Sequence, residues 1–280
     1  MSGFWKIVAV LACTLAFSTV CSAQGKVYTV KARMADFYSR TTKVVLSSDQ
    51  MLDLVLSDAV RTRWRVSPYE FCTEEEYESL RTNPSYYFLR VVYKDSEPGL
   101  VFLSLSKGGK TSRNTDIDSA FDVLLIPFDR VDFSTGKLSC ILPLFVDIVQ
   151  TYAEDARVME GRSFVGLTRY NKNIIGNRYS EMLVSDCDLN ESVSILPPGI
   201  IECPFDDVER AFAESRPCLV GITVCTEFPQ TGAKNYLFVV TADTNELYFF
   251  RTRPFDTYGS YGFTGMDLSM ISKFLRDDDR

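Results

Sequence analysis

The chain has 280 residues, with 30 basic and 37 acidic side chains, and hydrophobic residues make up 46% of it. This length and apolar content are enough to bury a large core, so we expect a folded protein. The net charge of −7, without a cluster of Lys or Arg, opposes binding to a phosphate backbone, and we expect no nucleic-acid partner. The sequence contains no histidine, which excludes Ser-His-Asp and Cys-His mechanisms and histidine-ligated zinc.

Residues 1–23 have the pattern of a cleavable secretory signal peptide. Lys6 carries the positive charge, residues 7–20 form an apolar run, and residues 21–23 (Cys-Ser-Ala) are the small residues that signal peptidase requires. The run is shorter than the about 20 apolar residues of a membrane span, so we expect no transmembrane segment. The sequence predicts a secreted or periplasmic protein. A lipoprotein is the less favoured alternative, because Val20 before Cys21 is a poor lipidation signal.

Residues 24–134 are predicted to form an N-terminal α/β unit. Alternating side chains indicate a strand within residues 27–46. One helix is expected to begin at Ser47 through a capping box with Gln50, and a second is expected after Thr73, which forms such a box with Glu76. The remaining elements are extended segments at residues 69–72, 86–93, 100–106 and 121–133.

Residues 135–280 are predicted to form a C-terminal α+β unit. A helix is expected from Pro143, because proline suits the first helical turn. Short strands are predicted within residues 163–196, a further helix from Pro204, and a final helix capped by Asp267. A buried strand and a hairpin complete the unit, at residues 218–226, 236–241 and 247–252.

The second unit repeats the order of elements in the first. Cys72 and the acidic helix start after it correspond to Cys203 at an offset of 131, and Leu89 corresponds to Ile222 after a two-residue slip. This pattern predicts an α+β fold with mixed β-sheets flanked by helices, and with the second unit as a diverged repeat of the first. The alternative, that any helix-then-strands unit resembles any other, stays open.

Six cysteines follow the signal peptide: Cys72, Cys140, Cys187, Cys203, Cys218 and Cys225. An even number in an oxidising compartment permits disulfides. We expect one or two, with the other thiols buried as small apolar groups. Cys72 and Cys203 each precede a helix, but the acidic residues that begin these helices oppose thiolate formation, so a structural role is favoured.

Residues 69–107 (YEFCTEEEYESLRTNPSYYFLRVVY…GLVFLSLSK), behind a signal that ends in Cys-Ser-Ala-Gln, resemble exported α+β proteins of Bacteroidetes type. The order of elements from about Lys43 to Ser106 is similar to the N-terminal domain of TolB and to periplasmic CsgG-like proteins. The resemblance implies a sheet with helices beside it and identifies no site residue. Asp118-Ser119-Ala120 is similar to the short O-glycosylation sequon of the same phylum.

Two stretches look like catalytic motifs but lack the context that the chemistry requires. Gly109-Lys110-Thr111 ends like a phosphate-binding loop, but Ser104 stands where the first glycine is needed. Ser104 and Lys107 have the spacing of a serine–lysine pair, but they lie in a predicted strand, where residues i and i+3 point to opposite faces. We therefore predict no catalytic, cofactor-binding or metal-binding residue.

The candidate ligand-binding residues are aromatic and separated by glycines near the C-terminus: Phe255, Tyr258, Tyr261 and Phe263. Such rings can stack against a sugar or a peptide. The alternative is that this loop folds over the sheet and contributes Phe255 and Phe263 to the core. We expect an exported, non-enzymatic module that binds a protein or a glycan at the cell envelope. The alternative function is a carboxylate-dependent glycan hydrolase, which needs two facing carboxyl groups.

Overall fold

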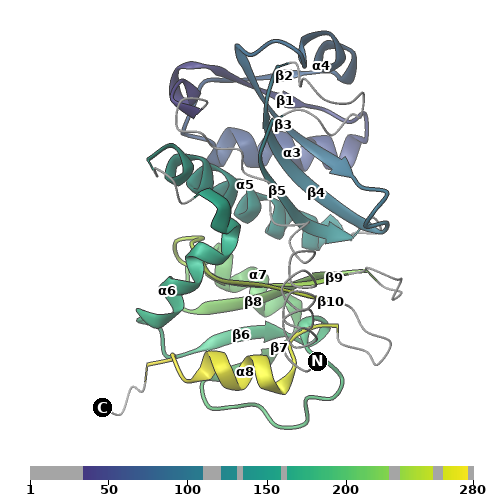
Figure 1. The fold of residues 1–280 in the computed structure, drawn as a ribbon. Helices are drawn as coiled ribbons and strands as arrows, with labels where there is room; N and C mark the ends of the chain where they lie inside the picture. Colours follow the sequence, from purple (N-terminus) through teal and green to yellow (C-terminus); the bar gives the residue numbers. More distant parts are fainter. Residues whose placement is uncertain are drawn as a thin grey trace, which may run out of the picture.

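Two five-stranded mixed sheets, with helices between them and on their outer faces, make up the protein (Figure 1). The computed structural model describes residues 34–109, 121–130, 135–158, 163–226, 234–254 and 261–276. The two sheets have similar topology, so the predicted α+β class with two similar halves is confirmed. Within these residues, no helix has an apolar stretch of the length that crossing a membrane requires.

The first sheet has the strand order β2-β1-β3-β4-β5. Strand β1 (Thr41–Val45) runs parallel to both β2 (Tyr69–Cys72) and β3 (Tyr86–Tyr93). Strands β4 (Leu100–Lys107) and β5 (Phe121–Arg130) follow in antiparallel order. The four strands after β1 lie where the sequence predicted extended segments.

The strand predicted within residues 27–46 is shorter than expected. A 3-10 turn, η2 (Phe37–Ser39), precedes β1, and residues 27–33 lie outside the described part. Phe37 is fully buried, and its ring packs edge-on against Tyr87 with the ring centroids 4.9 Å apart. The burial of this ring therefore fixes a turn where alternation alone indicated a strand.

Helix α3 (Gln50–Arg63) connects β1 to β2, and α4 (Glu74–Leu80) connects β2 to β3. Thr73 caps α4 and forms the predicted capping box with Glu76. Each partner satisfies a backbone N–H of the first turn that has no intrahelical acceptor.

The capping box predicted at Ser47 is wrong. Ser48 has a φ of 70°, and this left-handed turn separates Ser47 from the helix. Asp49 caps α3 instead, and its carboxylate accepts hydrogen bonds from the backbone N–H groups of Met51 and Leu52. A carboxylate therefore already occupies the positive end of this helix.

The second sheet has the strand order β10-β9-β8-β6-β7. Its strands are β6 (Met182–Ser185), β7 (Ile200–Cys203), β8 (Leu219–Cys225), β9 (Lys234–Thr241) and β10 (Leu247–Pro254). Strand β6 is parallel to β7 and β8, and β9 and β10 follow in antiparallel order. Each strand therefore has a counterpart in the first sheet, and β8 and the β9–β10 hairpin confirm the predictions.

Helices α7 (Phe205–Ala213) and α8 (Gly265–Ser272) lie on opposite faces of the second sheet. Helix α7 begins directly after Pro204, as predicted. The cap predicted for α8 is wrong, because Thr264 is its N-cap. Asp267 lies at the third helical position, where its carboxylate accepts a hydrogen bond from the backbone N–H of Thr264.

The segment of residues 163–196 contains one strand, β6, rather than the several short strands predicted. It also contains the 3-10 helices η4 (Ser163–Tyr170) and η5 (Asp186–Asp188) and the helix α6 (Asn171–Ile175). Side chains of α6 hydrogen-bond to the outer edge of β10. The helix therefore occupies the edge to which a further strand would pair.

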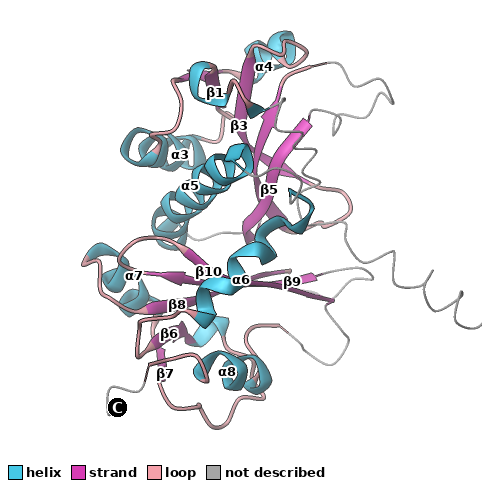
Figure 2. Ribbon diagram, turned by 60° about the vertical axis from the view of Figure 1, so that its left-hand side comes forward, coloured by secondary structure: helices cyan, strands magenta, loops and turns pink. Residues whose placement is uncertain are grey.

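The two units stack head to tail, with the strands of one sheet crossing those of the other (Figure 2). Cys72 and Cys203 hold the same place in their ladders, opposite Val45 and Ser185. Cys72 packs beneath α4 on the outer face of the first sheet, whereas Cys203 belongs to the core that α7 covers between the sheets. The layers are therefore α4, first sheet, α3 with the central helix α5 (Thr135–Val158), α7, second sheet and α8.

The ladders correct the correspondence of the third strands. Leu89 is the Cα partner of Val44, and Gly221 is the partner of Val184. Since Val44 and Val184 occupy equivalent places, Leu89 corresponds to Gly221. The correspondence with Ile222 that we predicted is therefore off by one residue.

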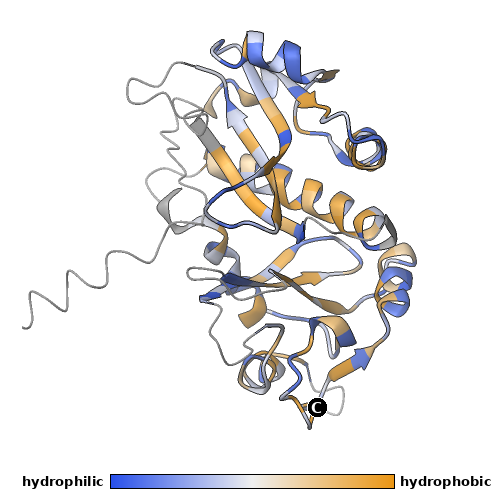
Figure 3. Ribbon diagram, turned by 90° about the vertical axis from the view of Figure 1, so that its right-hand side faces the viewer, coloured by the Kyte–Doolittle hydropathy of each residue, from blue (hydrophilic) through white to orange (hydrophobic). Residues whose placement is uncertain are grey.

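Helix α4 is a polar end to this stack (Figure 3). At the offset of 131, Glu74 and Arg81 stand where α7 has Phe205 and Phe212. The two phenylalanines pack against the core between the sheets. A polar outer helix is typical of the capping unit that ends a series of stacked repeats.

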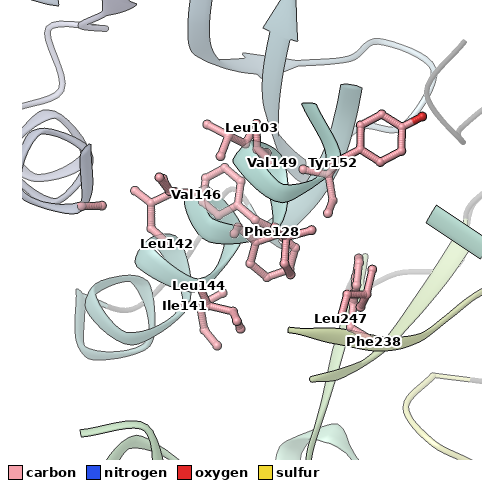
Figure 4. Close-up of a cluster of buried hydrophobic side chains, with 14 of the residues drawn as sticks. Leu103, Phe128, Ile141, Leu142, Leu144, Val146, Val149, Tyr152, Phe238 and Leu247 are labelled. Carbon is pink, nitrogen blue, oxygen red and sulfur yellow. The ribbon is translucent and has the colours of Figure 1, made fainter. Parts of the chain in front are cut away.

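Helix α5 forms the centre of the core between the sheets (Figure 4). The ring centroid of Phe145 lies 6.3 Å from that of Phe128 in the first sheet and 5.1 Å from that of Phe238 in the second. Helix α5 contacts α3 and β5 of the first unit and α7 of the second. Because it belongs to the packing of both units, the division of the chain between residues 134 and 135 stays a prediction.

The start of α5 differs from the prediction, because Pro143 lies inside the helix. A proline in a helix interior costs about 3 kcal/mol. Leu138, Ile141 and Leu142 are fully buried around it, and each buried side chain of this kind contributes about 1.5–3 kcal/mol. Burial between two sheets therefore outweighs the lost backbone hydrogen bond.

Candidate functional site

Of the four aromatic residues predicted to bind a ligand, the structure describes Tyr261 and Phe263. Phe255 and Tyr258 lie outside the described residues, and Tyr261 is half-buried. Phe263 is fully buried beneath α8. A Cβ atom at Gly221 would lie 2.9 Å from its ring, so this glycine makes room for Phe263. Phe263 has no exposed face to offer a ligand, and the alternative role in the core holds for it.

The six cysteines of the described residues are all free thiols, so the expectation of one or two disulfides is wrong. Three of them, Cys72, Cys203 and Cys218, are buried, and Cys140 and Cys225 are half-buried. Burial raises the pKa of Cys72 and Cys218 to about 11 and that of Cys140 to about 12. Cys187 alone among the six is exposed. The predicted structural role of Cys72 is consistent with this burial.

A cavity of about 490 Å³ lies beside α6, in the C-terminal unit. We call it the α6 groove. Its walls come from α5, from the end of η4 with α6, and from the start of β10: Thr151, Tyr170, Lys172, Asn173, Gly176, Glu246, Leu247 and Tyr248. Its volume is within the range of about 300–1,000 Å³ that small-ligand sites occupy.

Two asparagines hold α6 against β10 and so set the width of the α6 groove. The Asn171 side chain donates to the Phe250 carbonyl oxygen at 3.0 Å and accepts from the Phe250 N–H at 2.7 Å. The Asn173 Nδ2 donates to the Leu247 carbonyl oxygen at 2.9 Å. These amides satisfy the edge of β10 as a neighbouring strand would.

Two tyrosines form the aromatic part of the α6 groove. The hydroxyl of Tyr170 donates to Asp155 Oδ2 at 2.8 Å, which fixes the ring. Burial and this neighbouring carboxylate raise the pKa of Tyr170. The ring of Tyr248 packs edge-on against Tyr179, with centroids 5.8 Å apart. Both side chains are therefore held in place before any ligand binds, and with exposed fractions of 7% and 8% each presents a small part of its surface to the groove.

The charges of the α6 groove lie at its rim, on Lys172 and Glu246, which are both exposed. They carry opposite signs, so the groove as a whole is close to neutral. Glu246 is its single carboxylate, whereas glycoside hydrolysis requires two facing ones. The lining of the groove therefore offers both hydrogen-bond donors and hydrogen-bond acceptors, next to the side chains of Tyr170 and Tyr248.

Asp147 of α5 has a carboxyl group with a shifted pKa, and each of its two oxygens accepts a hydrogen bond from another side chain. Burial raises the pKa of its carboxyl group. Its oxygens accept hydrogen bonds from Gln150 at 2.7 Å and from Asn245 in the β9–β10 turn at 2.8 Å. Arg63 of α3 lies 3.7 Å away. These contacts tie the second unit to the first.

A second cavity, of about 290 Å³, lies between α7 and the edge strand β7. Its lining combines an apolar floor with a charged rim: Leu183, Ile201, Cys203, Asp207, Arg210, Ala211, Glu214 and Arg216. Asp207 and Glu214 are seven residues apart along α7 and its end, which separates them by about 10 Å along the axis. The carboxylate of Asp207 is paired with Arg210 at 2.9 Å.

Charged side chains are also buried where α5, β5 and β8 meet. Asp188 Oδ1 accepts hydrogen bonds from the backbone N–H and the hydroxyl of Thr223, at 2.8 and 2.6 Å. Burial alone would lower the pKa of Lys137, but the carboxylates of Asp188 and Asp129 outweigh it and raise the pKa. A lysine that stays protonated is suited to holding the units together rather than to nucleophilic attack.

No group of three or more Cys, Asp or Glu side chains in the described ranges is arranged to hold a metal ion. Comparison with known proteins found no matching family model, no matching curated protein and no matching solved structure. The resemblance to exported Bacteroidetes proteins and to the TolB and CsgG-like element order therefore stays a prediction.

Proposed function

We propose that the protein is an exported, non-enzymatic module of the cell envelope, and that its α6 groove binds a short neutral glycan. The observation that carries the proposal is the lining of the groove: two fixed tyrosines, Tyr170 and Tyr248, beside the polar side chains of Thr151, Lys172 and Asn173. A sugar presents hydroxyl groups that both donate and accept, and apolar ring faces that pack against aromatic side chains.

The hydrogen bonds that position these walls support binding over chemistry. Asn173 and Tyr170 already have partners within the protein, so the groove keeps its shape without a ligand. A preformed site loses little conformational entropy when it binds, which favours affinity. The single rim carboxylate, Glu246, can accept hydrogen bonds from a sugar hydroxyl without a second acid to complete a hydrolytic pair.

The test is calorimetric titration of the mature chain with a panel of neutral oligosaccharides. Thr151 is exposed on α5 at the edge of the groove, so Thr151→Trp should fill the groove without unfolding the helix. We expect this variant to lose at least about tenfold in affinity, equivalent to about 1.4 kcal/mol. Leu54→Trp, at an exposed position of α3, is the matched control and should bind as the wild type does.

Three results would count against the proposal. Absence of binding to the whole panel, or equal binding by Thr151→Trp, removes the groove as a glycan site. Release of reducing sugar that is abolished by Glu246→Gln would instead assign the alternative function, a carboxylate-dependent hydrolase.

A further inference from the structure

We propose that the outer edge of β7 binds an extended peptide segment of another protein and adds it to the second sheet as a further strand. β7 is an end strand of that sheet. Met182, the ladder partner of Ile200, donates its N–H to the Gly199 carbonyl oxygen at 2.8 Å. Because alternate residues of a strand direct their backbone groups to opposite edges, those of Glu202 point away from β6.

The backbone of Glu202 is available for pairing. Outside the sheet ladders, no backbone hydrogen bond among the described residues uses its N–H or its carbonyl oxygen, and in the ladder these groups point away from β6. The side chain of Ile201 beside it is 40% exposed. Unpaired groups at the edge of a sheet are the usual site at which an extended peptide adds to a protein.

Two of the other end strands, β10 and β2, carry side-chain contacts that β7 does not have among the described residues. The amide of Asn171 pairs with Phe250 at the edge of β10. In the first sheet, Phe71 of the end strand β2 stands at the place of Glu202, and the guanidinium of Arg61 lies 5.1 Å from its ring centroid. Arg61 belongs to α3, and the second unit has only the short η5 and a loop between its corresponding strands.

The cavity beside β7 favours an apolar side chain at every second position of the peptide. The side chains of Ile201 and Cys203 line it on the α7 face of the strand, together with Leu183 and Ala211. Side chains of an added strand alternate between the two faces of the sheet. One apolar residue of the peptide would therefore enter the 290 Å³ cavity while its neighbours lie on the opposite face, beside Glu202.

The charges at this edge favour a basic peptide. Arg210 is paired with Asp207 at 2.9 Å, and Arg216 with Glu181 at 2.6 Å. Glu202 and Glu214 are exposed, and no ion pair among the described residues includes either. The charges without an ion-pair partner at this edge are therefore negative. A peptide that fits the edge alternates apolar with basic side chains.

The test uses the full mature chain and the acetylated peptide TKVKVT carrying a fluorescent label, with anisotropy as the readout. We expect saturable binding that falls at least about tenfold in Glu202→Pro. Proline removes only an N–H that the native ladder does not use, and end strands tolerate it there. Glu202→Gln keeps the N–H and should weaken binding by about two- to fivefold. The peptide KTVVTK, with the same composition but no alternation, should bind at least about tenfold more weakly.

Glu209→Gln, on an exposed turn of α7 outside the cavity, is the charge control and should leave affinity unchanged. Circular dichroism of each variant confirms that it is folded. No binding of TKVKVT at about 1 mM, or equal binding by Glu202→Pro, overturns the proposal. Self-association of the chain that Glu202→Pro abolishes would assign the edge to a second copy and also overturns it. The α6 groove does not include β7, so either proposal can fail alone.

Discussion

The hydroxyl of Tyr236 donates a hydrogen bond to the carboxylate of Glu97, and this contact joins the two units. Glu97 lies in the turn between β3 and β4 of the first sheet, whereas Tyr236 lies on β9 of the second. Glu97 is 4% exposed and also pairs with Lys94 at 3.1 Å and with Lys234 at 3.8 Å. A buried carboxylate with partners from both units links their folding.

We expect Tyr236→Phe to lower the free energy of unfolding by about 1–3 kcal/mol, because it leaves the buried carboxylate of Glu97 with one donor fewer. Urea unfolding followed by circular dichroism measures the change. Tyr93→Phe removes the hydroxyl of an exposed tyrosine from β3 and should change the value by less than about 0.5 kcal/mol. Equal effects of the two variants would show that the link contributes nothing.

Helix α7 ends with a serine where a glycine fits better. Ser215 has a φ of 51°, and the N–H of Arg216 donates to the Ala211 carbonyl oxygen at 2.9 Å, as in a Schellman motif. We expect Ser215→Gly to raise the free energy of unfolding by about 0.5–1 kcal/mol. Ser79→Gly, inside α4, should have the opposite sign. Thermal and urea unfolding measure both effects. If Ser215→Gly destabilised the protein as Ser79→Gly does, the strain at Ser215 would be disproved.

The stability that Asp36 provides should depend on pH. Burial alone would raise the pKa of Asp36, but hydrogen bonds from Lys107 and Tyr87 outweigh it and lower the pKa. A carboxyl group with a lowered folded-state pKa stabilises the fold above its unfolded pKa of about 3.9, and this stability is lost as the pH falls through the folded value. Wild type should therefore exceed Asp36→Asn in stability at pH 6 by more than at pH 2.5. Urea unfolding at each pH measures the free energies. The same difference between wild type and Asp36→Asn at pH 6 and at pH 2.5 would contradict this role of Asp36.

Thiol labelling should separate one cysteine from the others. Cys187 is exposed, whereas burial raises the pKa of Cys72, Cys203 and Cys225. Because the thiolate is the reactive form, we expect iodoacetamide at pH 8 to modify Cys187 first, with the others reacting only after denaturation. Peptide mapping by mass spectrometry measures the order. In Cys187→Ser, the rapid phase should disappear; its persistence would show that another thiol is accessible.

The signal peptide is testable through the mature N-terminus. We expect the exported protein to begin at Gln24, since Ala23 ends the small-residue stretch that signal peptidase recognises. Intact-mass measurement and N-terminal sequencing of protein from the culture medium or periplasm check this. Ala23→Arg should block cleavage, because a large charged side chain does not fit that site. An N-terminus that retains residues 1–23 would contradict the prediction.

The α6 groove could not be predicted from the sequence, although the aromatic segment near the C-terminus could be identified. Tyr170 and Tyr248 both line the groove, but they are far apart in the chain and neither lies in a recognisable motif. Asn171 and Asn173 look like ordinary polar residues of a short helix. Their side chains bond to the backbone of β10, and a backbone partner leaves no signal in the sequence.

The burial of Phe263 could not be predicted from the sequence either. Glycines around it in the sequence indicated an exposed loop, whereas the ring fills the space above Gly221. The missing side chain at Gly221 is more than 40 residues earlier in the sequence. Local composition therefore could not distinguish an exposed ring from a buried one.

The sequence by itself determined the α+β class, the order of most elements and the capping box of Thr73 with Glu76. Hydrophobic alternation and helix capping depend on residues a few positions apart, so they can be identified without a structure. Only the tertiary structure decided that the units stack head to tail, with α5 between the sheets and with β7 as an end strand of the described second sheet. Those features depend on how much apolar surface segments far apart in the chain bury against each other. This buried surface is defined only by the folded arrangement, so local sequence patterns do not predict it.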